Sequence, residues 1–308
     1  MTTPFRSGFV CIVGRPNAGK STLTNALVGQ KVAITSGRPQ TTRHVIRGIL
    51  HREDAQVVLV DTPGLHRPRT LLGERLNMLV KETLGEVDAV VFCLPADQRV
   101  GPGDRFIAAQ LTELARGRTA PPIVAVATKA DLVPKGRLAE HLMAIAELGE
   151  WADIVPVSAV DGYQVDTLIE VLVSHLEPGP ALYPDGELTD EPEAVMVAEL
   201  VREAALEGVR DELPHSLAVV VDEIQPREGH VGPDGAPTLL DVRVNLFVER
   251  DSQKAIIIGK GGSRLRDVGA TARRGIEALL GTRVYLDLHV KVAKDWQRDP
   301  KQLSKLGF

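Results

Sequence analysis

The stretch Gly14-Arg15-Pro16-Asn17-Ala18-Gly19-Lys20-Ser21 matches the pattern G-x-x-x-x-G-K-[ST]. An apolar run over residues 9–13 precedes it and predicts a buried strand, and residues 21–28 after it predict a helix. A glycine-rich loop between strand and helix can wrap a polyphosphate, because inward backbone N–H groups and the helix N-terminus both favour an anion. The pattern predicts that residues 14–22, including Thr22, bind nucleotide phosphates. Lys20 would reach the β- and γ-phosphates and Ser21 would hold Mg²⁺. A glycine turn with a surface lysine is the alternative.

The composition is that of an ordinary globular protein. The chain has 308 residues, 44% of them hydrophobic and 25% charged, with a net charge of −5. Cys11 and Cys93 both fall in apolar runs, which favours buried thiols over a disulfide framework or a zinc site. No run approaches the roughly 18 apolar residues of a membrane span, and the N-terminus lacks a signal-peptide core. We therefore expect a cytoplasmic protein, with peripheral contact at the inner face of the cell membrane left open.

The first part of the chain, residues 1–177, alternates apolar Val/Ile-rich runs with helical patterns. Strands are expected at 9–13, 56–60, 89–94, 123–127 and 154–157, and helices at 21–28, 72–84, 105–114 and 138–148. Short strands that are almost entirely apolar are typical of a mostly parallel sheet covered on both faces. The pattern predicts a doubly wound α/β domain with its ligand site at the carboxyl ends of the strands.

A second candidate motif, Asp61-Thr62-Pro63-Gly64, directly follows the expected strand 56–60. A carboxylate at this strand end is placed to hold Mg²⁺, and the glycine lets a backbone N–H approach the γ-phosphate. A simple strand-ending turn is the alternative. Between the two motifs lies a polar loop with Thr41 and Thr42. We favour Thr42 as a further Mg²⁺ ligand that senses the γ-phosphate, which would make this loop a switch. Lys20, Thr42 and Gly64 are the expected catalytic groups.

A third motif predicts which purine is bound. Thr128-Lys129-Ala130-Asp131 follows the expected strand 123–127. The Asp131 carboxylate can accept two hydrogen bonds from a guanine edge, whereas adenine offers no such pair of donors, so GTP is selected over ATP. The stem of Lys129 can cover the ring. Residues Ser158, Ala159 and Val160, after the strand 154–157, would add a backbone N–H to the guanine oxygen.

The second part of the chain differs in charge and pattern. Residues 178–192, rich in proline, glycine and acidic groups, read as a linker. Residues 183–240 carry a net charge of −11 and residues 241–308 a net charge of +6, which points to a polyanion partner for the end of the chain only. From residue 193 to 308 the patterns predict helix 193–207, strands 216–224 and 239–248, helices 252–257 and 263–280 and strand 283–290, a small α+β domain.

Between those last two helices lies Gly259-Lys260-Gly261-Gly262, a G-x-x-G loop. Such a loop clamps a single-stranded nucleic acid backbone in KH domains, and the α-β-β-α-α-β order resembles the type II version of that fold. The expected RNA-binding residues are those of the loop and its basic surroundings: Ile258, Gly259, Lys260, Gly261, Gly262, Ser263, Arg264, Arg266, Arg273 and Lys291. A helix-turn-helix with a cationic face is the alternative. Trp296 could stack on a base or pack onto the domain edge, and the sequence leaves both open.

Together these motifs resemble the Era family of bacterial ribosome-assembly GTPases over nearly the whole chain. The resemblance implies a monomeric GTP-hydrolysing switch that uses Mg²⁺, binds the 3′ end of 16S ribosomal RNA and acts on the 30S subunit. One departure is Thr128, where the family usually has Asn, so nucleotide affinity is expected to be lower. Leu65 stands where small signalling GTPases carry a water-orienting Gln, which implies slow intrinsic turnover. Asn17 matches family members that recruit K⁺. The rival interpretation is a constitutive RNA-binding assembly protein with a passive nucleotide domain.

Overall fold

The structure is a computed structural model of the chain and describes residues 4–35, 43–66, 68, 70–114, 120–209, 216–232 and 235–308. The chain divides into two compact units, one formed by residues up to Asp190 except Thr70–Leu72, and one formed by residues from Glu191 onward together with Thr70–Leu72. Each unit has a hydrophobic core of its own.

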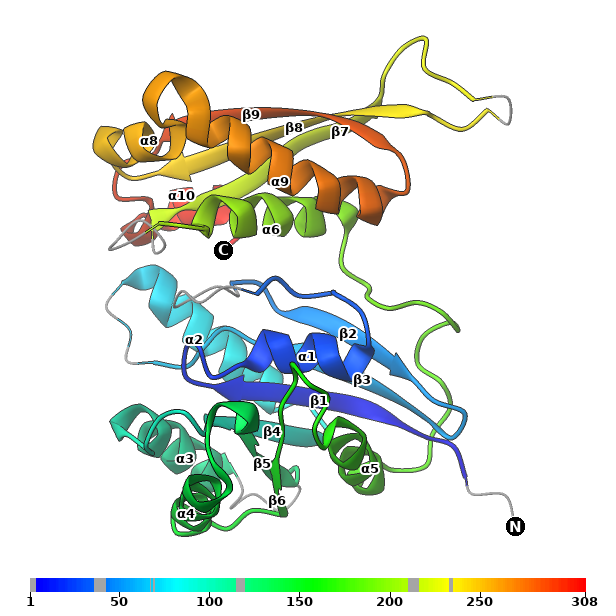
Figure 1. The fold of residues 1–308 in the computed structure, drawn as a ribbon, viewed down its shortest axis with the longest axis vertical. Helices are drawn as coiled ribbons and strands as arrows, with labels where there is room; N and C mark the ends of the chain where they lie inside the picture. The colour runs from blue at the N-terminus through cyan, green and yellow to red at the C-terminus, as the bar shows by residue number, and fades with distance from the viewer. Residues whose placement is uncertain are drawn as a thin grey trace. The chain divides into compact units, whose positions relative to one another are not determined.

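The first unit is built on a six-stranded sheet with the strand order β2-β3-β1-β4-β5-β6 (Figure 1). The strands are β1 Arg6–Gly14, β2 Ile46–His51, β3 Ala55–Asp61, β4 Ala89–Pro95, β5 Ile123–Thr128 and β6 Asp153–Pro156. All neighbouring pairs are parallel except β2 and β3. Every residue of β3, β4 and β5 is buried, as expected for strands covered on both faces.

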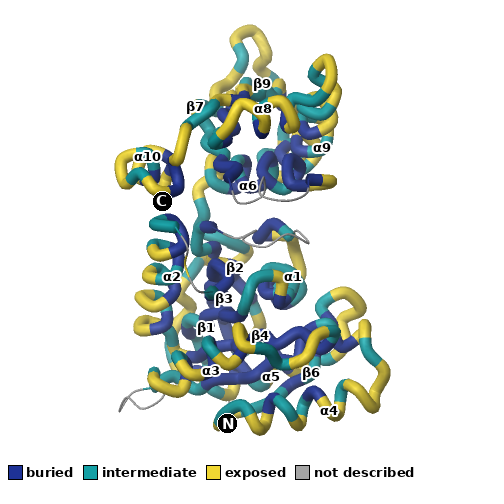
Figure 2. Tube along the Cα trace, turned by 90° about the vertical axis from the view of Figure 1, so that its left-hand side faces the viewer, coloured by how far each residue is buried: buried dark blue, intermediate teal, exposed yellow. Residues whose placement is uncertain are grey.

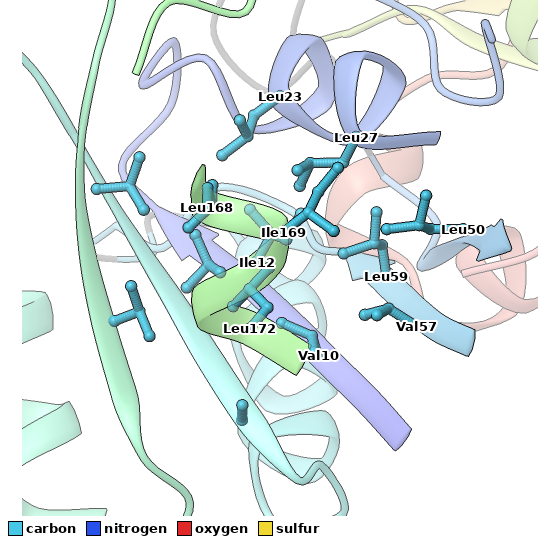
Figure 3. Close-up of a cluster of buried hydrophobic side chains, with 14 of the residues drawn as sticks. Val10, Ile12, Leu23, Leu27, Leu50, Val57, Leu59, Leu168, Ile169 and Leu172 are labelled. Carbon is cyan, nitrogen blue, oxygen red and sulfur yellow. The ribbon is translucent and has the colours of Figure 1, made fainter. Parts of the chain in front are cut away.

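Helices cover both faces of this sheet. They are α1 Lys20–Val28, α2 Leu71–Leu84, α3 Pro102–Leu114, α4 Lys135–Ala146 and α5 Val165–His175. One core cluster joins the sheet to α1 and α5 through side chains such as Leu23 and Leu168 (Figure 3). A second cluster joins the other face to α2, α3 and α4. In Figure 2 the strands of this sheet are coloured mostly as buried. The predicted doubly wound fold is confirmed.

Strand β2 was not predicted, because its sequence does not have the continuous apolar run of its neighbours. Gly48 interrupts it, and the structure gives the reason for the glycine. A Cβ at Gly48 would lie 2.8 Å from Cγ2 of Val28 at the end of α1. The strand pairs antiparallel to β3, with Ile46 opposite Asp61. It follows the loop 36–42, which lies outside the described residues.

The predicted linker is held against the first unit over much of its length. The buried side chain of Gln56 donates to the Tyr183 carbonyl at 2.9 Å and accepts from the Leu182 and Tyr183 N–H groups at 2.6 and 2.9 Å. The Ile49 N–H donates to the Leu188 carbonyl at 2.8 Å, on the open edge of β2. Because these bonds fix backbone groups that a free linker would leave to water, residues 178–190 form an ordered strap on the sheet.

The second unit contains a three-stranded sheet, β7-β8-β9, with β7 antiparallel and β9 parallel to β8. Its elements are α6 Glu193–Leu206, β7 Ala218–Pro226, β8 Leu239–Val248, α8 Asp251–Ile258, α9 Ser263–Leu280, β9 Arg283–Val292 and α10 Pro300–Lys305. The predicted α-β-β-α-α-β order is confirmed. Helices α6, α8 and α9 share one core with the inner face of the sheet. None of the helices in the described part of the chain combines the length and hydropathy needed to cross a bilayer.

Candidate nucleotide site and nucleic-acid interface

The phosphate loop connects β1 to α1, as the sequence predicts. Its first glycine is required by packing, since a Cβ at Gly14 would lie 2.8 Å from the Cys93 carbonyl oxygen of β4. Gly19 has a φ of 86°, in the left-handed region that favours glycine. Lys20 is 7% exposed, and its Nζ donates to the Arg15 carbonyl at 3.3 Å. Burial lowers the pKa of Lys20, while the nearby Asp61 carboxylate acts in the opposite direction. A cation held in this way is available to phosphate oxygens.

Oxygen ligands suitable for a divalent cation converge beside this lysine. The Ser21 hydroxyl donates to Asp61 Oδ2 at 2.7 Å, although the two residues are 40 positions apart. Asp61 ends β3 and is fully buried. Hydroxyl and carboxylate oxygens are the ligands that Mg²⁺ prefers, so this pair fits the predicted metal. Thr42, the third predicted ligand, lies outside the described residues.

The segment after β3 lies directly against the phosphate loop. A Cβ at Gly64 would lie 2.7 Å from the backbone nitrogen of Pro16, so only glycine permits this approach. The Thr62 hydroxyl donates to the Ile12 carbonyl of β1 at 2.7 Å. Leu65 is 2% exposed and belongs to the core cluster on the α2 face. Its side chain therefore packs in the core, and slow intrinsic turnover stays a prediction.

The guanine-recognition segment is tied to the phosphate loop by the residue that departs from the family pattern. The Thr128 hydroxyl, buried at the end of β5, donates to the Ala18 carbonyl at 2.6 Å. Lys129 has a left-handed φ of 59° and its Nζ lies 3.1 Å from Asp97 Oδ2. Asp131 is exposed, which leaves its carboxylate accessible to a ligand. A threonine therefore performs the tethering with its hydroxyl.

The last predicted nucleotide segment is joined to this one by the backbone. The Ala130 N–H donates to the Val157 carbonyl at 3.2 Å, immediately before Ser158. Ser158 is fully buried, whereas Val160 is 82% exposed. The Ser158 hydroxyl accepts a hydrogen bond from the Asp161 N–H at 3.4 Å. The structure thus brings together all the predicted nucleotide motifs that lie within the described residues, at the carboxyl edge of the parallel strands.

In the second unit the G-x-x-G loop forms a tight turn between α8 and α9. Gly259 has a φ of 71°, and a Cβ there would lie 2.7 Å from Cβ of Arg264. Gly261 and Gly262 also have positive φ, but a Cβ on either would meet open space. Lys260 is exposed. Two of the three glycines therefore leave the outer side of the loop open, which is what close approach of a phosphate backbone requires.

A groove runs from this loop between α9 and the edge strand β9. Its volume is about 410 Å³, and its lining combines apolar side chains with arginines: Gly262, Leu265, Arg266, Gly269, Ala270, Arg273, Tyr285, Leu286 and Leu288. The predicted RNA-binding residues Arg266 and Arg273 lie here and are exposed, and Lys291 is exposed on β9. An apolar floor with a cationic rim suits bases on one side and phosphates on the other.

Two of the predicted basic and aromatic residues have structural partners. Arg264 Nη2 donates to the carbonyls of Ala205 and Glu207, at 3.2 and 2.7 Å, where α6 ends. This places a cation at the negative end of the helix dipole. Trp296 is completely buried, and its Nε1 donates to the Ser216 carbonyl at 3.0 Å. Packing, one of the two alternatives for Trp296, is therefore correct, and base stacking is excluded.

Sequence reasoning missed Tyr285, which lines the groove with half of its surface exposed. Its ring also lies 4.4 Å below the guanidinium carbon of Arg227. The sequence did contain a signal for this residue, because Tyr285 is an aromatic residue at an outward position of the predicted strand 283–290. Exposed aromatic side chains stack readily on bases. Sequence reasoning also missed Asp97, in the turn after β4, and Asp104, on α3, because their places beside the nucleotide motifs follow from tertiary packing.

Two family models match the chain. Residues 9–129 match a family described as 50S ribosome-binding GTPase, and residues 212–297 match the KH domain family. These ranges correspond to the two units that carry the nucleotide motifs and the G-x-x-G loop.

Curated relatives match the chain from end to end. GTPase Era of Mycolicibacterium smegmatis is 67% identical over 307 residues, which cover 99% of this chain and 100% of the relative. GTPase Era of Streptomyces coelicolor is 66% identical over 311 residues, covering 99% of this chain and 96% of the relative.

Solved structures match both units together. An Era structure in complex with MgGDPNP and nucleotides 1506–1542 of 16S ribosomal RNA superimposes with a TM-score of 0.91 at 36% identity. The match covers 98% of this chain and 99% of the Era chain in that complex. A variant of Aquifex aeolicus Era bound to GDP and aluminium fluoride gives a TM-score of 0.90 at 36% identity, with the same coverage.

Proposed function

The chain belongs to the Era family of GTPases, and on that premise we propose that it is a GTP-driven switch that binds the 3′ end of 16S ribosomal RNA and acts in assembly of the 30S subunit. GTP hydrolysis is the activity of the family. The protein would act as a monomer in the cytoplasm.

One observation supports the nucleotide assignment most strongly. Ser21 and Asp61 meet at 2.7 Å and Thr128 reaches Ala18 at 2.6 Å, so two separate motifs converge on the phosphate loop. Mg²⁺ held by Ser21 and Asp61, with Thr42 as the remaining predicted ligand, would neutralise charge on the phosphates. Lys20 and the backbone N–H groups of residues 17–22 would bind the phosphate oxygens. Gly64 would present its N–H to the γ-phosphate, and Asp131 would accept from guanine.

Competition binding tests this assignment. A fluorescent GTP analogue bound to the protein should be displaced by GTP and GDP but not by ATP, and removal of Mg²⁺ with a chelator should weaken GTP binding. Displacement by ATP at the same concentration as GTP would contradict the role of Asp131.

The RNA assignment depends on the groove between α9 and β9. The exposed Lys260, Arg266 and Arg273 supply the cationic groups, and Leu265, Leu286 and Leu288 the apolar surface. Neutralising one phosphate-contacting cation should weaken binding across RNA sequences and lower the salt dependence by about one ion. Arg52 is a suitable control, since it is paired with Asp54 in the first unit.

A binding experiment separates the switch from its rival. An oligonucleotide with the 3′-terminal sequence of 16S RNA is titrated with protein loaded with a non-hydrolysable GTP analogue or with GDP. The switch requires that the two forms differ in RNA affinity, because a ligand shifts an equilibrium only through differential affinity. Equal affinities would support the constitutive RNA-binding protein with a passive nucleotide domain. Cell fractionation, with the protein in the soluble or the membrane fraction, tests the compartment.

A further inference from the structure

The residue Asp104, which lies on α3 and outside all the nucleotide motifs, contacts the phosphate loop directly. Its Oδ1 lies 2.9 Å from Nε of Arg15, the second residue of the loop. The Asp104 side chain is 2% exposed and that of Arg15 is 24% exposed. A charge-assisted hydrogen bond with so little access to water is shielded from salt and holds its geometry more firmly than a surface pair.

The carboxylate of Asp104 is itself fixed by its own helix. Its second oxygen, Oδ2, accepts from the Gly101 N–H at 2.8 Å, at the start of α3. Gly103, also on α3, lies against the aliphatic part of the Arg15 side chain, since a Cβ at Gly103 would be 3.7 Å from Arg15 Cδ. Both carboxylate oxygens are therefore used, one to cap the helix and one to hold the arginine, so α3 acts as a rigid support for the loop.

Arg15 connects this support to the reacting region through its backbone. Its carbonyl accepts from Lys20 Nζ and from the Ala18 N–H, each at 3.3 Å. The next residue, Pro16, is the surface against which Gly64 lies with no space for a Cβ. The first turn of the phosphate loop thus positions the catalytic lysine and receives the glycine that meets the γ-phosphate.

We propose that Asp104 is a positioning residue for GTP hydrolysis, which acts by anchoring Arg15 and thereby fixing the Arg15–Pro16 turn relative to Lys20 and Gly64. The role follows from the chain of contacts Asp104–Arg15–Lys20, and it concerns the γ-phosphate side of the loop. GDP keeps the β-phosphate that Lys20 contacts but lacks the γ-phosphate that Gly64 meets, so its binding should change less than the rate of hydrolysis. This proposal rests on the assignment of the phosphate loop given above.

The test compares hydrolysis with binding in three single variants, a double variant and a control. Asp104→Asn removes the charge and Arg15→Ala removes the anchored group without touching the cap of α3. Each should lower the single-turnover rate of GTP hydrolysis about tenfold or more, because small displacements of catalytic groups have large kinetic effects. The dissociation constant of GDP should change less than about threefold in both. Arg15→Lys, which retains a cation for Asp104, should recover most of the rate.

The double variant Arg15→Ala/Asp104→Asn decides whether the two residues act through one contact. Its rate should equal that of the slower single variant, since an interaction can be lost only once. Asp54→Asn is the matched control: it breaks an ion pair of the same 2.9 Å length whose carboxylate is 45% exposed, and its rate should be unchanged.

Three outcomes would overturn the proposal. The first is an unchanged hydrolysis rate in Asp104→Asn when thermal unfolding shows the variant to be folded, which would leave Asp104 with a helix-capping role alone. The second is multiplicative effects in the double variant. The third is an equal loss of GDP and GTP binding at an unchanged hydrolysis rate. If the protein failed to bind any guanine nucleotide, the assignment of the phosphate loop would be wrong, which is a separate result.

Discussion

The hydroxyl of Thr128 is the most informative single group to remove. Threonine stands at a position where the family usually has asparagine, and the structure gives it a defined partner, the Ala18 carbonyl at 2.6 Å. The substitution Thr128→Val keeps the shape of the side chain and deletes only the donor. Because Thr128 is 4% exposed, water does not easily replace the lost hydrogen bond.

The size of the effect follows from that burial. A buried carbonyl left without its donor costs about 1–3 kcal/mol. Every 1.4 kcal/mol is a factor of ten in an equilibrium constant. If the cost is expressed as a weaker arrangement of the guanine and phosphate loops, the dissociation constant of GDP should rise about 5- to 140-fold. Thr128→Ser retains the hydroxyl and should stay within about threefold of the natural protein. Thr128→Asn, which can also supply an amide, should bind GDP at least as tightly.

Displacement of a fluorescent GDP derivative measures all three variants, and chemical denaturation checks that each is folded. The reasoning would be refuted if Thr128→Val bound GDP as tightly as the natural protein and was equally stable. It would also be refuted if Thr128→Ser lost as much affinity as Thr128→Val, because that result would assign the effect to packing of the methyl group and not to the hydrogen bond.

Four further predictions concern other residues. Asp131→Asn replaces a double acceptor by an amide, so GTP affinity should fall by at least about tenfold while xanthosine triphosphate gains, as competition binding will show. Hydrolysis should be faster in K⁺ than in Na⁺ buffer, and Asn17→Ala should abolish the difference; equal rates in both buffers would exclude a K⁺ site. Trp296→Ala removes a fully buried ring that stacks on Phe308, and should lower the free energy of unfolding by about 3–5 kcal/mol in denaturant titrations. Burial lowers the pKa of His141, so its contribution to stability is complete above the ordinary value of 6.5 and is lost as the pH falls through the lower folded value. The loss of stability between pH 7 and pH 5 should therefore be smaller in His141→Gln than in the natural protein.

The elements that sequence reasoning located well are those whose signal is local. The bounds of β8 and α9 are those predicted, because alternation of apolar residues in one and a helical period bounded by glycines in the other depend on near neighbours alone. Strand β2 was missed because Gly48 has no apolar side chain there. The glycine is needed only because Val28 and Val32, which are distant from it in the sequence, pack against it in the folded structure.

The sequence by itself determined the predictions of the chemistry: which residues bind phosphates, which carboxylate selects guanine, and which loop meets a nucleic acid backbone. Those properties follow from residue types at fixed short spacings, so they can be recognised without coordinates. Only the tertiary structure decided the supporting contacts. Asp104 meets Arg15 across 89 positions and Thr128 meets Ala18 across 110, and Gln56 holds the strap at Tyr183. Such pairs have no local signature, because they arise from the packing of elements that are far apart in the chain.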